Sequence, residues 1–96
     1  YGQLLIAQAA DTLLNMQGIT ASFVIGTLED GRVAISARSQ GDLNVQLVME
    51  NLGGGGHLTD AAVQLKDVTL AEARERLMEA LKQLIEEEGS SNESHL

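Results

Sequence analysis

The spacing of apolar residues divides the chain into helical and strand-like segments. Three segments carry apolar side chains at every third or fourth position, which predicts helices with one buried face; these are residues 3–16, 43–52 and 70–87. Three others are short runs rich in β-branched and apolar residues, which predicts strands; these are residues 22–28, 32–39 and 62–68. Glu29-Asp30-Gly31 is a turn signal, so the first two strands are expected to form a hairpin.

Local signals refine the ends of the predicted helices. Asp42 is a candidate N-cap for the second helix. Thr69 followed by Glu72 is the capping-box pattern and predicts the start of the last helix. A further helical turn is expected over residues 57–62, directly after the glycine run.

This order of elements predicts an α/β fold. We expect a small two-layer domain in which helices pack on a mixed β-sheet, with a glycine-rich loop between a helix and a strand. Residues 1–88 are expected to form this domain, because a chain of 96 residues has room for one core only. Residues 89–96 lack a core pattern and are expected to form a disordered acidic tail.

Composition narrows the possible functions. The chain has 14 acidic and 6 basic residues and a formal net charge of −8, which argues against binding to duplex DNA or anionic lipid through a basic surface. It has no cysteine, which excludes disulfides, thiolate chemistry and zinc sites with sulfur ligands. No apolar run approaches the length of a membrane span, and the start at Tyr1 suggests a piece of a longer protein.

The chain by itself carries no catalytic pattern. Neither His57 nor His95 has a second ligand at metal-binding spacing, so no metal site is expected here, and His95 lies in the predicted tail. No nucleophile elbow and no P-loop pattern occurs. We therefore expect no catalytic residue in this chain.

The segment Gly53-Gly54-Gly55-Gly56-His57 is the main candidate for ligand binding. Residues without Cβ let a ligand approach the backbone, and successive N–H groups can surround an anion. His57 adds a side chain that becomes cationic near neutral pH. The alternatives are a flexible linker and an incidental loop histidine.

Arg38-Ser39, at the end of the second strand, is the other candidate. A guanidinium matches a phosphate through a bidentate fork. The helix over residues 43–52 would return the chain so that Arg38 meets the glycine segment. The alternative is an ordinary surface arginine at a strand end.

These residues resemble a known family, the accessory C-terminal domain of DHH phosphoesterases. The resemblance rests on Arg38-Ser39, Asn44-Val45, Gly53–His57 and Ala61-Ala62, and extends over residues 1–88. Residues 21–25 and 61–65 most resemble the cyclic-di-AMP phosphodiesterase branch. Val63 stands where many family members have glycine, which fits that branch and weakens the comparison with exonuclease-like members.

The resemblance implies a role and a set of partners. Arg38 and Ser39 correspond to the family's substrate-contacting pair, and Gly53, Gly54, Gly55, Gly56 and His57 to its phosphate-binding loop. Two Mn²⁺ ions would lie in a separate N-terminal DHH domain, so this chain alone would be inactive. Expected partners are a cyclic dinucleotide or short oligonucleotide, the DHH domain and a second copy of the parent protein. The parent would be a membrane-anchored bacterial protein with this part in the cytoplasm.

Other functions remain open at this point. The same loop would suit an oligoribonuclease or a 3′-phosphoadenosine phosphatase. A non-catalytic RNA-binding appendage is a third hypothesis, against which the acidic charge argues. A protein-interaction domain without a ligand is the fourth.

Overall fold

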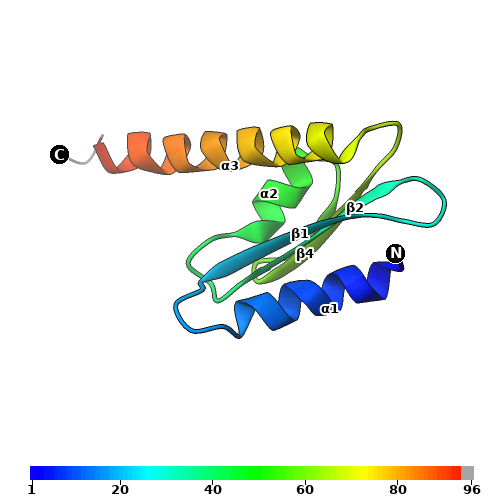
Figure 1. Cartoon of the computed structure of the whole chain (residues 1–96). Coiled ribbons are helices and arrows are strands. Elements are labelled where there is room, and N and C mark those ends of the chain that lie inside the picture. Colours follow the sequence, from blue (N-terminus) through cyan, green and yellow to red (C-terminus); the bar gives the residue numbers. More distant parts are fainter. Residues whose placement is uncertain (94–96) are drawn as a thin grey trace.

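The computed structural model describes residues 1–93, which form three helices and four strands (Figure 1). In chain order these are α1 (Gln3–Leu14), β1 (Ala21–Thr27), β2 (Val33–Ser39), α2 (Val45–Asn51), β3 (Gly55–His57), β4 (Asp60–Leu65) and α3 (Leu70–Glu93). The α/β class and all six elements expected from the sequence are confirmed. β3 is an additional strand, and the predicted tail is helical as far as Glu93, whereas His95 lies outside the described residues.

The four strands form one sheet in the order β1-β2-β4-β3. Every neighbouring pair is antiparallel, so the prediction of a mixed sheet is wrong. The physical reason is β3. A helix joining two adjacent strands normally makes them parallel, but β3 reverses the chain once more after α2. β4 therefore runs antiparallel to β2.

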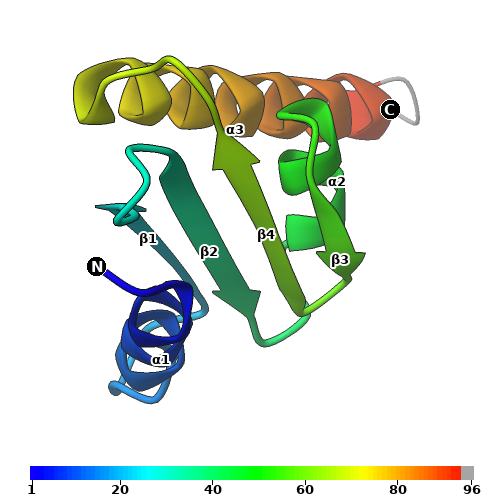
Figure 2. The same ribbon diagram turned by 90° about the vertical axis from the view of Figure 1, so that its right-hand side faces the viewer.

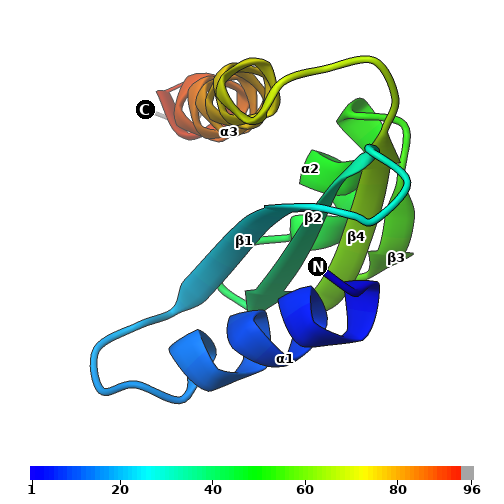
Figure 3. The same cartoon turned by 45° about the vertical axis from the view of Figure 1, so that its right-hand side comes forward.

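Helices cover both faces of the sheet, so the domain has three layers rather than the two predicted. α1 packs on β1 and β2 from one side, and α2 and α3 lie on the other side (Figures 1 and 3). β2 is consequently buried on both faces. Val33, Ile35 and Ala37 face the core under α2 and α3, while Ala34 packs in a smaller cluster with Ile6 of α1.

Local hydrogen bonds fix the starts of two helices. The predicted capping box is present, because Thr69 Oγ1 accepts from the N–H of Glu72 at 3.0 Å and the N–H of Thr69 donates to Glu72 Oε1 at 3.1 Å. The N-cap of α2 is Asn44, whose side chain accepts from the N–H of Leu47 at 3.3 Å. The prediction of Asp42 as this cap is wrong, since α2 begins later than expected.

Candidate functional site

One part of the sheet has no helix over it. α1 packs on β1 and β2, but the same side of β4 and β3 is left uncovered (Figure 2). We call this region the open face; it is formed by Arg38, Gly55, His57, Asp60 and Ala62. His57 and Asp60 are exposed there, and Gly55 and Ala62 are partly exposed.

Strand register brings the two sequence candidates together on the open face. Arg38 of β2 lies opposite Asp60 of β4, and Asp60 lies opposite His57 of β3. Residues directly opposite each other in antiparallel strands project to the same side of the sheet. Arg38, Asp60 and His57 therefore form a row across three strands, although they are distant in sequence.

Two carboxylates hold the Arg38 side chain. Its Nε donates to Asp11 Oδ1 of α1 at 2.6 Å, and its Nη1 lies 2.9 Å from Asp60 Oδ1. Nη1 also donates to the carbonyl oxygen of Ala37 at 2.9 Å. The side chain is only 11 % exposed, and a charge that is this buried needs such partners. These contacts orient the guanidinium and leave Nη2 as its remaining donor group.

Ser39 is separated from Arg38. Successive strand residues project to opposite faces, so Ser39 lies on the α2 side of the sheet. It is buried, and its Oγ accepts from the N–H groups of Gly41 at 2.9 Å and Leu43 at 3.3 Å. Ser39 therefore shapes the loop that leads into α2, and the structure does not bring it onto the open face.

The glycine segment is not the loop that the sequence predicts. Gly53, with φ of 95°, ends α2, and the N–H of Gly54 donates to the carbonyl of Met49 at 2.8 Å. Gly55–His57 is the edge strand β3, which pairs with β4. The expected helical turn over residues 57–62 is also wrong, because residues 58 and 59 form the tight turn between β3 and β4. Pairing with β4 satisfies the hydrogen-bonding groups on one side of the β3 backbone. The outer edge of β3 remains unpaired in the sheet.

The glycines in this segment are required for different reasons. A Cβ at Gly54 would meet the backbone of Ala62 and lie 2.6 Å from Val63 Cβ. A Cβ at Gly56, whose φ is 143°, would lie 2.5 Å from Ala61 Cα. Gly55 differs, because its φ is ordinary and an added Cβ would meet nothing within 4 Å. The fold explains glycine at 54 and 56, whereas it gives no reason for glycine at 55.

Two acidic residues of this site were missed from the sequence. Asp11 lies on a helix and Asp60 follows a turn, and acidic residues are common in both positions. Only the register of β2 with β4 and the packing of α1 identify them as the partners of Arg38. No sequence spacing could have given that contact.

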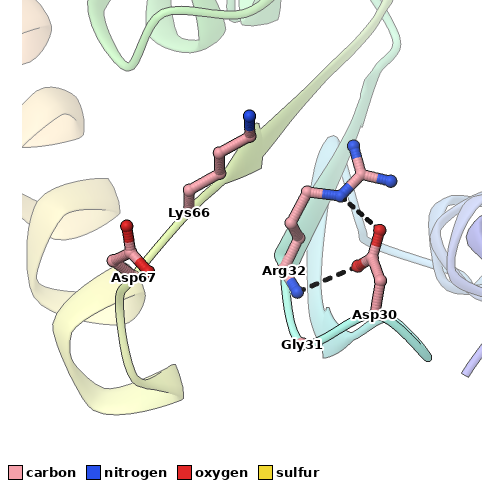
Figure 4. Close-up of a pocket in the computed structure, with 5 residues that line it drawn as sticks. All are labelled: Asp30, Gly31, Arg32, Lys66 and Asp67. Atoms are coloured by element: carbon pink, nitrogen blue, oxygen red, sulfur yellow. Dashed lines mark hydrogen bonds and ion pairs between the residues drawn. The ribbon is translucent and has the colours of Figure 1, made fainter.

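A cavity of about 570 Å³ lies at the opposite end of β2. Figure 4 shows its lining, which consists of Asp30, Gly31, Arg32, Lys66 and Asp67. Arg32 is already bound there, since it pairs with Asp30 at 2.7 Å and donates to Gln64. The backbone N–H of Arg32 donates to Asp30, and this bond lowers the pKa of the Asp30 carboxyl. No sequence candidate lies in this cavity, so the open face is the better candidate site.

Two further features of residues 1–93 bear on function. No group of three or more histidine or acidic side chains is close enough to hold a metal ion. In the same range, no helix combines the length and the apolar character that crossing a bilayer requires.

Comparison with known proteins decides the family. The profile of the DHHA1 domain matches residues 3–87. The chain is a DHHA1 domain. Its relatives include a protein of Geobacillus thermodenitrificans named cyclic-di-AMP phosphodiesterase GdpP, which is 60% identical over 86 residues, 90% of this chain and 13% of the relative. In Listeria monocytogenes, cyclic-di-AMP phosphodiesterase PdeA is 58% identical over 81 residues, 84% of this chain and 12% of the relative.

A more distant relative carries another name. The bifunctional oligoribonuclease and PAP phosphatase NrnA of Thermus thermophilus is 37% identical over 68 residues, 71% of this chain and 21% of that protein. All three matches leave most of the relative outside the aligned region. The DHHA1 domain thus spans only 13% of the length of the first of these relatives.

Proposed function

We propose that this DHHA1 domain binds the substrate of a manganese-dependent phosphodiesterase that hydrolyses cyclic-di-AMP. Identity of 60% and 58% to two proteins with that name supports the choice of substrate. The observation that carries the proposal is the row of Arg38, Asp60 and His57 beside the unobstructed backbone of Gly55. Recognition of a phosphodiester requires a cation, a hydrogen-bond donor and an accessible backbone.

The residues of the open face have separate parts in this proposal. Arg38 donates from Nη2 to a phosphate oxygen while Asp11 and Asp60 hold the guanidinium in place. His57 donates to the same group from its imidazole. Gly55 lets the substrate reach the backbone of β3. The other candidates shape the backbone: Ser39 shapes the loop before α2, and the glycine segment is shaped by Gly53, Gly54 and Gly56.

The rest of the reaction belongs to parts of the parent protein beyond this domain. The family resemblance implies two Mn²⁺ ions in a separate DHH domain, where they would activate water. That domain and the cyclic dinucleotide are the expected partners. Membrane anchoring of the parent, with this domain in the cytoplasm, is supported by the family resemblance alone.

Kinetics of the parent enzyme test the proposal. With Mn²⁺ and cyclic-di-AMP, we expect Arg38→Ala and His57→Ala each to lower kcat/KM by about tenfold or more, the effect of losing a charge-assisted contact of roughly 1.5–3 kcal/mol. Lys66→Ala, in the cavity at the other end of β2, is the matched control and should leave kcat/KM unchanged. Normal kinetics in both site variants would contradict the assignment of the open face.

An oligoribonuclease or 3′-phosphoadenosine phosphatase activity is the second candidate, because NrnA is among the relatives. The two candidates share the open face and differ in substrate. Comparison of kcat/KM of the parent enzyme for cyclic-di-AMP and for a short RNA distinguishes them. A higher value for RNA would favour the second candidate.

A further inference from the structure

Asp60 occupies the middle of the row on the open face, between the two side chains that are proposed to bind phosphate. It lies opposite Arg38 on β2 and opposite His57 on β3. Directly opposite residues have Cβ atoms about 4.5–5.5 Å apart, so the carboxylate is close to any group that these two side chains hold. A carboxylate in this position repels a phosphate. Phosphate binding alone therefore gives no reason for an acidic residue here.

One oxygen of Asp60 is free to accept a hydrogen bond. Oδ1 lies 2.9 Å from Nη1 of Arg38, and within the described part of the chain Oδ2 has no hydrogen-bond partner. The side chain is 61% exposed, so a ligand on the open face can reach it. A carboxylate has acceptor sites only. Asp60 thus favours a ligand that carries a hydrogen-bond donor.

The contacts of Arg38 place this donor next to the phosphate. Nη1 is occupied by Asp60 and by the carbonyl oxygen of Ala37, and Nε is occupied by Asp11. A phosphate oxygen therefore binds at Nη2. Nη2 and Nη1 are bonded to the same carbon, so a phosphate on Nη2 lies beside the carboxylate on Nη1. The donor that meets Asp60 must then belong to the part of the ligand nearest the phosphate.

A ribonucleotide has such a donor in its 2′-hydroxyl. This hydroxyl is on the carbon next to the one that bears the 3′-phosphate, whereas the amino group of adenine is at the far end of the base. The 2′-hydroxyl is also the group by which proteins distinguish RNA from DNA. Carboxylates bind ribose hydroxyls in the same way in dinucleotide-binding folds.

We propose that Asp60 accepts a hydrogen bond from the ribose 2′-hydroxyl beside the bound phosphate and makes the open face selective for ribonucleotides over deoxyribonucleotides. The phosphate is taken as bound by Arg38 and His57, so this role of Asp60 rests on the proposed function. The hydroxyl offsets the repulsion between Asp60 and the phosphate, whereas a sugar without it leaves that repulsion uncompensated. Cyclic-di-AMP and a short RNA both carry the hydroxyl, so the role is the same for either substrate.

Kinetics of the parent enzyme with two substrates test this role. Cyclic-di-AMP is compared with an analogue in which fluorine replaces both 2′-hydroxyls, because fluorine removes the donor while the sugar keeps a ribose-like pucker. The wild-type kcat/KM should be about tenfold or more higher for cyclic-di-AMP, as expected for a hydrogen bond to a charged group. In Asp60→Ala this preference should fall to within about threefold.

Two control variants separate a direct contact from indirect effects. Asp11 also holds the guanidinium of Arg38, but through Nε. Asp11→Ala should therefore lower kcat/KM for both substrates and leave the preference unchanged. Asp42→Ala removes an exposed acidic residue outside the row, and it should leave the preference unchanged as well.

Failure of this role and failure of the proposed function give different results. Equal kcat/KM of the wild-type enzyme for the two substrates, or an unchanged preference in Asp60→Ala, would overturn the role of Asp60 even where Arg38→Ala lowers kcat/KM for both. An equal loss of preference in Asp11→Ala would overturn it too, because the effect would then come from the orientation of Arg38. Normal kinetics of Arg38→Ala and His57→Ala would contradict the proposed function, and the role of Asp60 with it.

Discussion

At the scale of single residues, the site combines what the sequence indicates with what only the fold provides. Arg38 and His57 stand out in the sequence, and register confirms that they lie in one row on one face. Ser39 stands out equally but projects to the other face, since strand residues alternate. Asp11 and Asp60 have no distinguishing pattern, and their contact with Arg38 depends on tertiary packing.

The charge of Asp60 should oppose the binding of an anion. One guanidinium and two carboxylates meet at Arg38, so the site carries a net negative charge when His57 is neutral. Asp60→Asn removes one of these charges and loosens the hold on Nη1. We expect the affinity of the chain for inorganic phosphate to rise about two- to fivefold, as for removal of a half-exposed charge worth roughly 0.5–1 kcal/mol.

Phosphate titration followed by NMR measures this change. Asp42→Asn, an exposed acidic residue outside the ion pairs of Arg38, controls for the general effect of lower negative charge. Weaker phosphate binding by Asp60→Asn than by the wild type would show instead that orientation of Arg38 outweighs repulsion.

Gly54, Gly55 and Gly56 should respond differently to alanine. Gly54→Ala and Gly56→Ala place a Cβ against β4 and should lower the free energy of unfolding by about 1–3 kcal/mol, the usual cost of overpacking. Gly55→Ala should leave the free energy of unfolding unchanged or slightly higher, because its Cβ meets nothing. Urea denaturation measures all three. Equal losses at positions 54, 55 and 56 would contradict the geometry of β3.

At the scale of elements, periodicity predicts the helices and the longer strands but not β3. Glycine has low strand propensity and no side chain, so a glycine run gives no strand signal. β3 forms because small residues at 54 and 56 let it approach Ala61 and Ala62 of β4 closely.

Some residues on the apolar faces predicted for the helices are exposed in the structure. Leu5 of α1 and Leu70 of α3 fit the helical pattern but are 54% and 49% exposed, since α1 and α3 each contact the sheet over a narrow strip.

The start of α2 gives a test at this scale. Asn44→Ala removes the cap of α2 and should cost about 1 kcal/mol of unfolding free energy. Asp42→Ala should cost less than about 0.5 kcal/mol, because Asp42 lies three residues before the start of α2 at Val45 and makes no capping bond. Thermal or urea unfolding of the two variants decides between them. A larger loss for Asp42→Ala would restore the assignment made from the sequence.

At the scale of the whole molecule, the helices determine which surfaces are available. α1 covers only half of its face of the sheet, and this leaves the open face beside β3 and β4 (Figure 2). The sequence predicts helices packed on a sheet but not their distribution over two faces, because the second face of β2 carries Ala34, Ser36 and Arg38, a pattern that does not mark it as buried.

An NMR titration of the 96-residue chain with cyclic-di-AMP directly tests whether the open face binds the substrate. We expect the largest amide shifts on Gly55, Gly56, His57 and Asp60, and we expect Arg38→Gln to remove them. Shifts confined to Gly31, Lys66 and Asp67, around the cavity at the other end of β2, would contradict it. Absence of any shift at saturating ligand would contradict it as well.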